Sequence, residues 1–458
     1  MIRPFRSIPG PKAWPLIGNL HEYTITNKYD FQRLHRNGLK KYKEFGPLVH
    51  EEIIQGEHIV WIYDPEDIKT LFQSEGKYPS RRSHLALEKY RRDRKDLYNN
   101  GGLLPTNGEE WARMRSVAQK PLTTQLLGTH MMDIEKAADD LIQVLRQQRV
   151  VQDVHSELKK FFVEVTGIVL FGVRLQAIGS RDDSSLDGAL LIKAAEETNS
   201  NILQTDLGLP IWKYYDTKAY SAIKESQRVF ESIALKRIKE CTSPNSLVHT
   251  YSKQLGFKDI VTLVGDFLLA GIDTSANTMA FLLHELARCP GQVQEDLCQS
   301  ANVGRSGYID QVALNSFKFG KAVIKENFRL HPISVGVGRK LAHPATFSGF
   351  QVPQGINVVT QNQVSCRLPE FCPVKPNEFW PYRYMSNEHK LHPYLSLPFG
   401  FGPRMCIGRR LAEMSLQILL LKMSRTFHIE SADKAEIECK SLLINQPERP
   451  VKLKLSPR

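Results

Sequence analysis

The sequence lacks closely paired cysteines and long apolar runs. Its seven cysteines are scattered over 458 residues, and no two of them stand in a Cys-x-x-Cys pair. An odd, unpaired set argues against a secreted disulfide framework and against a structural zinc site, and it fits a reducing compartment. No apolar stretch approaches the roughly 20 residues that cross a bilayer, so we expect no transmembrane helix.

The chain also lacks internal linkers and repeats. Its interior contains no Ser/Gly-rich or Pro-rich linker, and no repeat with a period of roughly 20 to 50 residues. Hydrophobic residues make up 41% of the chain and charged residues 24%, which is enough apolar material for a large core. These features predict one large globular domain over residues 1–458, with a proline-rich N-terminal segment at 1–20.

Acidic residues are in the minority. The chain has 61 Lys and Arg against 49 Asp and Glu, which gives a formal charge of +12, and the densest basic cluster is KYRRDRK at 89–95. No recognised nucleic-acid-binding signature accompanies this charge, so we expect no nucleic-acid partner and solvated basic faces instead. The segment 1–6 is basic and free of acids, as the end of a mitochondrial presequence would be.

Two segments far apart in the sequence read as strands. Alternating apolar residues predict two strands at 47–63, and the following Asp64-Pro65 is typical of a helix start. A second β block is expected at 345–362, with a tight hairpin turn at Pro353–Gly355. The sheet region would therefore be assembled from distant parts of the chain.

Most of the remaining sequence has helical periodicity. From about residue 110 to about residue 330, apolar residues recur with the spacing of amphipathic or buried helices. This stretch predicts a helical core. The fold class expected from the sequence is mainly α with a small β region.

One cysteine lies in an unusual loop, LPFGFGPRMCIGRR at 397–410. Glycines let a backbone pass close to a flat ligand, and the dipole of the following helix stabilises a thiolate at Cys406. Arg404 offers a fixed fork for a carboxylate. A coincidental Gly/Cys turn is the alternative, but five positions match the spacing Phe-x-x-Gly-x-Arg-x-Cys-x-Gly over 399–408. They are Phe399, Gly402, Arg404, Cys406 and Gly408.

A second motif, AGIDTS at 270–275, breaks the local rules of a helix. Good helix formers flank it, yet Gly271 costs about 1 kcal/mol in a helix interior, and acid and hydroxyl side chains compete for backbone hydrogen bonds. In one interpretation Gly271 ends one helix and Asp273 or Thr274 caps the next. In the functional interpretation the helix distorts over a cofactor, Thr274 holds an oxygen-derived ligand or water, and Asp273 relays protons to it.

Two further pairs are unspecific when taken alone. Glu326 and Arg329 share a helix face in KAVIKENFRLHP, as surface ion pairs commonly do. Trp111 and Arg115 place an aromatic ring and a cation one helical turn apart in GEEWARMR. They gain weight only in combination with the two motifs above.

In combination, these segments resemble the cytochrome P450 family, the haem-thiolate monooxygenases, over essentially the whole chain. The Cys406 loop resembles the family's haem-binding motif, and 270–275 resembles its oxygen-activation helix. Glu326 and Arg329 resemble its structural pair, which Arg383 in FWPYRYM would complete. The resemblance implies the P450 fold and a non-covalent haem b with Cys406 as its iron ligand. The cofactor-binding set it implies is Trp111, Arg115, Arg339, Phe399, Arg404, Cys406 and Gly408, with Trp111 and the three arginines holding the propionates.

The resemblance extends to the mitochondrial class of the family. That class receives electrons from an adrenodoxin-like ferredoxin, which is reduced by NADPH through ferredoxin reductase, and it uses O₂. The pattern K-x-x-x-K-E-x-x-R and a basic pair after the haem loop match its partner-binding positions, which here are Lys321, Lys325, Arg409 and Arg410. A mitochondrial location on the matrix side of the inner membrane, with peripheral membrane contact, is therefore expected.

Segments outside the shared motifs resemble arthropod ecdysteroid 22-hydroxylases of moulting-hormone synthesis. Examples are YPSRRSHLALEKYR, AAEETNSNILQTDLGLPIW and SLLINQPERPV. The resemblance implies a steroid substrate, an ecdysteroid precursor hydroxylated at C22. The residues expected to line an apolar, sterol-shaped cavity are Leu103, Leu104, Asn201, Leu203, Leu269, Val335, Val337 and Leu443.

Other functions stay open at this point. A 2- or 20-hydroxylase of the same pathway would share the fold and the electron donor. A haem-thiolate isomerase or dehydratase needs no donor, but such proteins often lack the acid and alcohol pair that Asp273 and Thr274 provide. A non-catalytic haem or sterol-binding protein would use the same thiolate without proton delivery.

Overall fold

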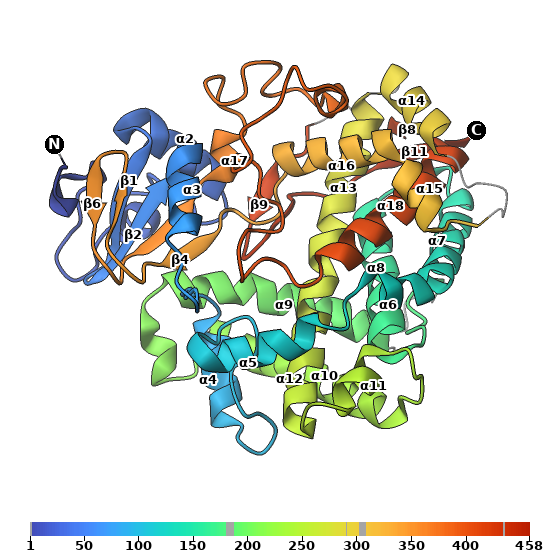
Figure 1. Cartoon of the computed structure of the whole chain (residues 1–458), viewed down its shortest axis with the longest axis horizontal. Coiled ribbons are helices and arrows are strands. Elements are labelled where there is room, and N and C mark those ends of the chain that lie inside the picture. The colour runs from blue at the N-terminus through green and yellow to red at the C-terminus, as the bar shows by residue number, and fades with distance from the viewer. Residues whose placement is uncertain (1, 180–186, 290, 302–307, 434–435) are drawn as a thin grey trace.

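The computed structural model describes residues 2–179, 187–289, 291–301, 308–433 and 436–458, so the parts of the expected helical core at 180–186, 290 and 302–307 lie outside the described residues. Helices dominate the fold (Figure 1). The α-helices are α1 His21–Thr24, α2 Leu34–Phe45, α3 Pro65–Gln73, α4 Leu85–Asp93, α5 Gly108–Gln119, α6 Thr124–Thr129, α7 Met131–Arg146, α8 Val154–Phe171, α9 Asp187–Leu207, α10 Lys218–Glu240, α11 Leu247–Ser252, α12 Phe257–Gly271, α13 Asp273–Arg288, α14 Gln292–Ser300, α15 Gln311–Ser316, α16 Lys318–Leu330, α17 Asn362–Ser365 and α18 Arg409–Thr426.

The strands are short, and those of the described residues form four small sheets. Short 3₁₀-helices accompany them, namely η1 Phe5–Ser7, η2 Pro210–Lys213 and η3 Pro381–Tyr384. The strands are β1 Leu48–Ile54, β2 Glu57–Ile62, β3 Val150–Val151, β4 Gly338–Lys340, β5 Ala345–Phe347, β6 Phe350–Val352, β7 Asn357–Thr360, β8 Phe427–Ser431, β9 Cys439–Ser441, β10 Asn445–Pro447 and β11 Leu453–Pro457.

The largest sheet joins the two distant β segments that the sequence predicts. Its strand order is β1-β2-β7-β4, and β2 pairs in parallel with β7 through Ile59–Ile62 against Asn357–Thr360. It lies at the N-terminal end of the molecule, where blue and orange ribbons are interleaved (Figure 1). Helix α3 follows as expected, because Asp64 accepts a hydrogen bond from the Glu66 N–H and Pro65 occupies the first turn.

The expected hairpin turn at Pro353–Gly355 is wrong. The hairpin is formed by β5 and β6, and its turn is Ser348-Gly349, two residues with φ of 48° and 79°. Two consecutive positive φ angles suit the right-handed twist of a tight hairpin. Pro353–Gly355 instead connects β6 to β7, which belongs to the larger sheet. The sheets β3-β11-β8 and β10-β9 near the C-terminus were not expected from the sequence.

The core is built around α8, α12 and α13. Every residue of α8 from 161 to 171 is buried, and α13 is buried throughout 275–284. A helix that is apolar or buried on all sides belongs in the centre of a large domain. Helix α13 runs through the middle of the molecule, with α16 and α18 on one side and α9 on the other (Figure 1). No helix among the described residues is both long and apolar enough to span a membrane.

The AGIDTS motif marks a break between two nearly continuous helices. Helix α12 ends at Gly271, α13 begins at Asp273, and Ile272 between them keeps helical torsions (φ −82°, ψ −70°). A Cβ on Gly271 would stand 2.9 Å from the Thr166 hydroxyl of α8, so close helix packing requires the glycine. Gly271 therefore does end a helix, but neither Asp273 nor Thr274 caps α13, and that part of the capping interpretation is wrong.

Candidate functional site

The cysteine loop is held in shape by its own backbone. The Cys406 N–H donates to the Phe399 carbonyl at 2.8 Å, and the Met405 N–H donates to the Gly402 carbonyl at 3.0 Å. Gly402 has φ +73°, and a Cβ there would lie 2.5 Å from a Glu75 carboxylate oxygen, so glycine is required. Gly408 is the N-cap of α18. The loop therefore presents Cys406 at the N-terminal end of a helix, as the motif predicts.

Cys406 combines solvent exposure with surroundings that shift the pKa of its thiol. Its side chain is accessible to water, yet burial raises the pKa of the thiol, and the Gly408 N–H, the Arg115 guanidinium and the Arg409 N–H oppose that rise. A thiol bound to a metal is deprotonated outright. The donors around the sulfur are those that stabilise such a thiolate.

Arg115 of α5 bonds to the cysteine loop, and Arg404 within the loop bonds to the segment before α5. Arg115 donates to the Met405 carbonyl at 2.8 Å, next to the cysteine. Arg404 donates to the Thr106 carbonyl at 2.7 Å and to the Leu103 carbonyl at 3.3 Å. Its guanidinium carbon lies 4.6 Å from the centre of the Trp111 ring, so the tryptophan positions Arg404 through a cation–π contact.

Two more arginines complete a positive cluster. Arg339 of β4 pairs with the Glu75 carboxylate. Arg81, which was not among the expected residues, donates to the Leu104 carbonyl at 2.7 Å. Burial and the neighbouring Arg81, Arg339 and Arg115 together lower the pKa of Arg404 to about 8, against the opposite effect of Glu75.

The cluster fits a haem with two propionates. In the described part of the chain, three guanidinium groups lower the pKa of the fourth, that of Arg404, and only one carboxylate, that of Glu75, bonds to any of the four. Buried like charges are stable only when anions compensate them. Two propionate carboxylates beside an open thiol would supply that compensation. The donor set is therefore suited to haem, with Cys406 towards iron and the arginines towards the propionates.

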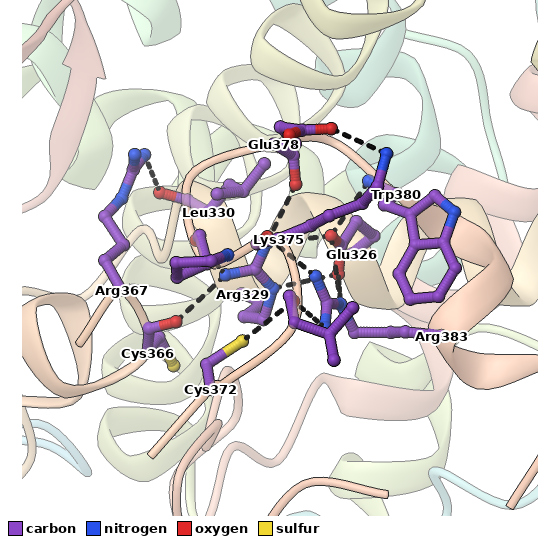
Figure 2. Close-up of polar contacts among 12 residues, drawn as sticks. Glu326, Arg329, Leu330, Cys366, Arg367, Cys372, Lys375, Glu378, Trp380 and Arg383 are labelled. Atoms are coloured by element: carbon purple, nitrogen blue, oxygen red, sulfur yellow. Dashed lines mark hydrogen bonds and ion pairs between the residues drawn. The ribbon is translucent and has the colours of Figure 1, made fainter. Parts of the chain in front are cut away.

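The Glu326 cluster is fully buried and fully bonded (Figure 2). Arg329 donates to both Glu326 oxygens at 2.9 and 2.8 Å, and Arg383 of η3 donates to both at 3.0 and 3.2 Å. The backbone N–H of Trp380 adds a fifth hydrogen bond to Glu326 at 2.9 Å. The structure thus brings together Glu326, Arg329 and Arg383, of which the first and the last are 57 positions apart in the sequence.

Both arginines of this cluster also bind backbone carbonyls of the segment that leads toward the cysteine loop. Arg329 donates to Cys366 at 2.9 Å and to Glu378 at 3.0 Å (Figure 2). Arg383 donates to Val374 and to Lys375, both at 2.9 Å. The ion cluster therefore ties α16 to residues 366–383.

Asp273 and Thr274 make different contacts at the start of α13. The Thr274 hydroxyl donates to the Ala270 carbonyl at 2.7 Å across the helix break. Asp273 is buried, and one of its oxygens accepts a hydrogen bond from Asn199 of α9 at 2.8 Å. Burial raises the pKa of Asp273, and the neighbouring Lys159 counteracts it. A buried acid with a raised pKa beside an alcohol is the composition of a proton relay.

The basic residues expected to bind a partner lie on two helices that pack together. Lys325 of α16 is exposed, as are Arg409 and Arg410 at the start of α18. Lys321 is half-buried, and Glu413 of α18 counteracts the fall in its pKa that burial causes, so the two helix faces are neighbours. Arg409 pairs with Glu413 at 3.0 Å. The four cations thus share the side of the molecule from which α18 leaves the cysteine loop.

The expected cavity residues are distributed over three hydrophobic clusters. Leu103, Leu104 and Leu269 belong to the main core, Val337 packs on the N-terminal core, and Leu443 packs on the cluster of α4, α9 and α10. Val335 is buried, while Leu203 and Asn201 are half-buried. The Asn201 amide donates to the Glu197 carbonyl of its own helix at 2.7 Å, so this side chain is used locally.

Sequence reasoning missed three residues of the site. Arg81 and Glu75 precede α4, and Asn199 lies on α9. Nothing in the local sequence distinguishes them, because each acquires its role from a partner far along the chain. The only available signal was that Arg81 and Asn199 lie inside segments that resemble the arthropod enzymes.

Comparisons with known proteins identify relatives of the whole chain. The family model described as Cytochrome P450 matches residues 8–455. Cytochrome P450 302a1, mitochondrial, of Drosophila melanogaster is 40% identical over 469 residues, which cover 99% of this chain and 95% of that protein. The 1,25-dihydroxyvitamin D(3) 24-hydroxylase, mitochondrial, of Mus musculus is 28% identical over 99% of this chain and 89% of its own length. The cholesterol side-chain cleavage enzyme, mitochondrial, of Oncorhynchus mykiss is 27% identical over 100% and 91%.

Proposed function

This chain belongs to the cytochrome P450 family of haem-thiolate monooxygenases, and on that basis we propose that it hydroxylates an ecdysteroid precursor at C22 in moulting-hormone synthesis. The carrying observation is identity of 40% with a mitochondrial relative over nearly the whole of both chains. That identity extends well beyond the haem motifs. The segments that resemble arthropod 22-hydroxylases also lie outside the haem motifs. Mitochondrial relatives that are named for vitamin D and cholesterol support a steroid substrate.

Haem b supplies O₂ activation when it is bound, because a thiolate ligand favours O–O cleavage. In our proposal Cys406 holds the iron. Arg81, Arg115 and Arg404 neutralise the propionates, and Trp111 supports Arg404. Arg339 adds positive charge near the propionates, although Glu75 balances part of that charge. Phe399 and Gly408 shape the loop around the sulfur.

Asp273 and Thr274 would control protons on the side of the haem facing α13. The Thr274 hydroxyl bonds to Ala270 and can rotate toward a bound water, and Asp273 is adjacent in sequence. A positioned acid of raised pKa hands over a proton more readily than an exposed carboxylate does. These two residues therefore form our proposed acid and alcohol pair.

A mitochondrial ferredoxin would bind over Lys321, Lys325, Arg409 and Arg410. The patch is basic, solvent-facing and adjacent to α18, whose N-terminus carries Cys406. An acidic partner is attracted to such a patch, and complementary charge raises the association rate. Docking here would bring the donor to the cysteine side of the cofactor.

Membrane contact would involve the connection between α9 and α10. Four large apolar side chains flank or belong to η2 and are exposed to solvent, namely Leu209, Ile211, Tyr214 and Tyr215. Apolar side chains with neighbouring cations are typical of surfaces that rest on a lipid bilayer. Flotation with liposomes should capture the wild type and release a variant with I211S and Y214S. Equal flotation of both proteins would contradict membrane binding through these side chains.

The function is tested by reconstitution with ferredoxin, its reductase and NADPH. A panel of ecdysteroid precursors is offered, and products are assigned by mass spectrometry and nuclear magnetic resonance. We expect hydroxylation at C22 with NADPH consumed in step with product. Hydroxylation at C2 or C20 alone would contradict the regiochemistry, and steroid binding without NADPH-dependent product would identify a binding protein instead.

A further inference from the structure

A single buried asparagine anchors the hairpin formed by β9 and β10. Asn445 is the first residue of β10, pairs with Ser441 of β9 and is only 1% exposed. Its Oδ1 atom accepts a hydrogen bond from the Ser441 hydroxyl at 2.9 Å. The two residues therefore close the hairpin tip at 442–444, which carries Leu443, one of the residues expected to line the steroid cavity.

Asn445 also bonds to the segment that follows α16. Its Nδ2 atom donates to the Pro332 carbonyl at 2.8 Å, and its backbone N–H donates to the Ile333 carbonyl at 2.8 Å. This segment leads directly to Val335, which is buried and is a second residue expected in the cavity wall. One asparagine thus joins two wall segments that lie 113 positions apart in the sequence.

Two further amides hold the asparagine in place. The Nδ2 atom of Asn445 also donates to the side-chain oxygen of Gln363 on α17 at 3.0 Å, and the Asn445 carbonyl accepts from the Asn277 amide of α13 at 3.1 Å. The side-chain oxygen, the side-chain nitrogen, the backbone N–H and the backbone carbonyl of Asn445 are therefore all bonded. A buried polar group satisfied in this way fixes one local geometry.

The hairpin tip is also connected to the start of α13. The Leu443 N–H donates to the Asn199 carbonyl of α9 at 3.2 Å, and the Asn199 amide donates to Asp273 at 2.8 Å. Movement of the tip would therefore displace an expected cavity residue and the backbone that holds the acid. Misplacement by about 1 Å at a reacting centre can change a rate about 100-fold.

We propose that Asn445 is a positioning residue that selects which steroid carbon is hydroxylated. It keeps the tip 442–444 and the segment 332–335 at a fixed separation, so that a rigid, largely apolar substrate fits between them in one orientation. The C–H bonds of a steroid side chain differ little in reactivity, so placement must choose among them. This inference rests on the proposed steroid hydroxylase function, but not on C22 as the carbon attacked.

The first test compares two buried asparagines in the haem-loaded enzyme. N445A removes the three side-chain bonds of Asn445, and we expect the ratio of the main hydroxylated product to all other products to fall about tenfold. N327A is the matched control, because Asn327 of α16 is equally buried but donates to the Thr278 carbonyl at 3.0 Å. Both variants should unfold at a lower temperature, whereas only N445A should change the product ratio. A wild-type ratio in N445A, or an equal change in N327A, would overturn the proposal.

The second test needs no substrate. Amide hydrogen exchange at 439–447 and 332–335 should be faster in N445A than in wild type and unchanged in N327A. If N445A fails to retain haem, S441A removes only one bond and should shift exchange and product ratio in the same direction by a smaller amount. Wild-type values in S441A would then overturn the proposal.

The two proposals fail in different ways. Wild-type hydroxylation at a carbon other than C22 would contradict the proposed regiochemistry, while the product ratios of N445A and N327A would still test the role of Asn445. Faster exchange in N445A with an unchanged product ratio would show that the asparagine is structural only, and would leave the hydroxylase function intact.

Discussion

Two buried ionic clusters are associated with α13, one on the neighbouring α16 and one at the start of α13 itself, and they are built in opposite ways. In the Glu326 cluster both carboxylate oxygens accept hydrogen bonds from Arg329 and Arg383. In the Asp273 cluster one oxygen binds Asn199 and the other has only Lys159 at 3.9 Å. The first cluster is closed to solvent, while the second adjoins a polar pocket.

The difference separates a structural role from a chemical one. A buried ion cluster whose donors and acceptors are all satisfied fixes one geometry and resists rearrangement. Burying a carboxylate that lacks some of its hydrogen bonds costs free energy. Such a carboxylate can, however, take up and release a proton, which suits it to a chemical role. We therefore expect substitutions in the two clusters to affect different measurements.

The largest effect is expected at Glu326. E326Q leaves two buried guanidinium groups without their anion, which should cost about 3–5 kcal/mol of unfolding free energy. We expect little haem-loaded protein, measured by haem absorbance per polypeptide after purification. E378Q is the matched control, because the Glu378 carboxylate is exposed and pairs with Lys375 at the surface. Normal haem content in E326Q would show that the cluster does not hold the fold.

A large effect on rate, without an effect on stability, is expected at Asp273. D273N removes a poorly satisfied buried charge while keeping the side-chain volume, so the midpoint of thermal unfolding should stay the same or rise. Steroid hydroxylation should fall about 100-fold because a general acid is lost. Hydroxylation at the wild-type rate would contradict the relay, and loss of haem in this variant would assign Asp273 to the structural class instead.

The basic patch extends the comparison to charges that face solvent. K321E with K325E should raise the ferredoxin concentration for half-maximal turnover about tenfold at low salt, and added salt should reduce the difference. The control variant carries K193E and K218E, two exposed lysines on α9 and α10. Unfolding should be unaffected in both. Turnover of K321E/K325E that matches the control at low salt would place the ferredoxin elsewhere.

The smallest expected effect is on the pH dependence of stability. Burial lowers the pKa of His155 to about 3, so the histidine is neutral in the folded state and takes up a proton first in the unfolded state. Its contribution to stability is present above its ordinary pKa of about 6.5 and is lost as pH falls from there toward 3. H155Q should make the fall of stability with acid shallower by at most one proton, as measured by urea unfolding at several pH values. An identical slope would contradict the neutral assignment.

Local signals predicted local structure well. The two strands at 47–63 and the helix start at Asp64-Pro65 are confirmed, because alternation and capping act within a few residues. The hairpin turn was misplaced because Ser348 adopts a positive φ, which is uncommon for serine. Pro353–Gly355 does contain a turn, but that turn leads from β6 into β7 of a different sheet. The short C-terminal sheets depend on pairing partners as distant as β3 and β11.

In the candidate site, too, the features that depend on neighbouring residues were predictable and those that depend on distant residues were not. The Cys406 loop was predictable because its chemistry is contained in ten residues, and the structure places its sulfur at the start of α18. Arg81, Glu75 and Asn199 were missed because their functions arise only when distant segments meet. Asp273 and Thr274 were identified from a local irregularity, but the unsatisfied oxygen and its pocket became visible only in three dimensions.

The measurement that tests the central claim most directly is the carbon monoxide spectrum of the reduced protein. If Cys406 supplies a thiolate to haem iron, the wild type and the control C298S should both show the long-wavelength Soret band of thiolate-ligated haem, because the axial ligand sets the electronic state of the iron. C406S should lose that band together with NADPH-dependent turnover. An unchanged band in C406S, or no such band in the haem-loaded wild type, would contradict the assignment.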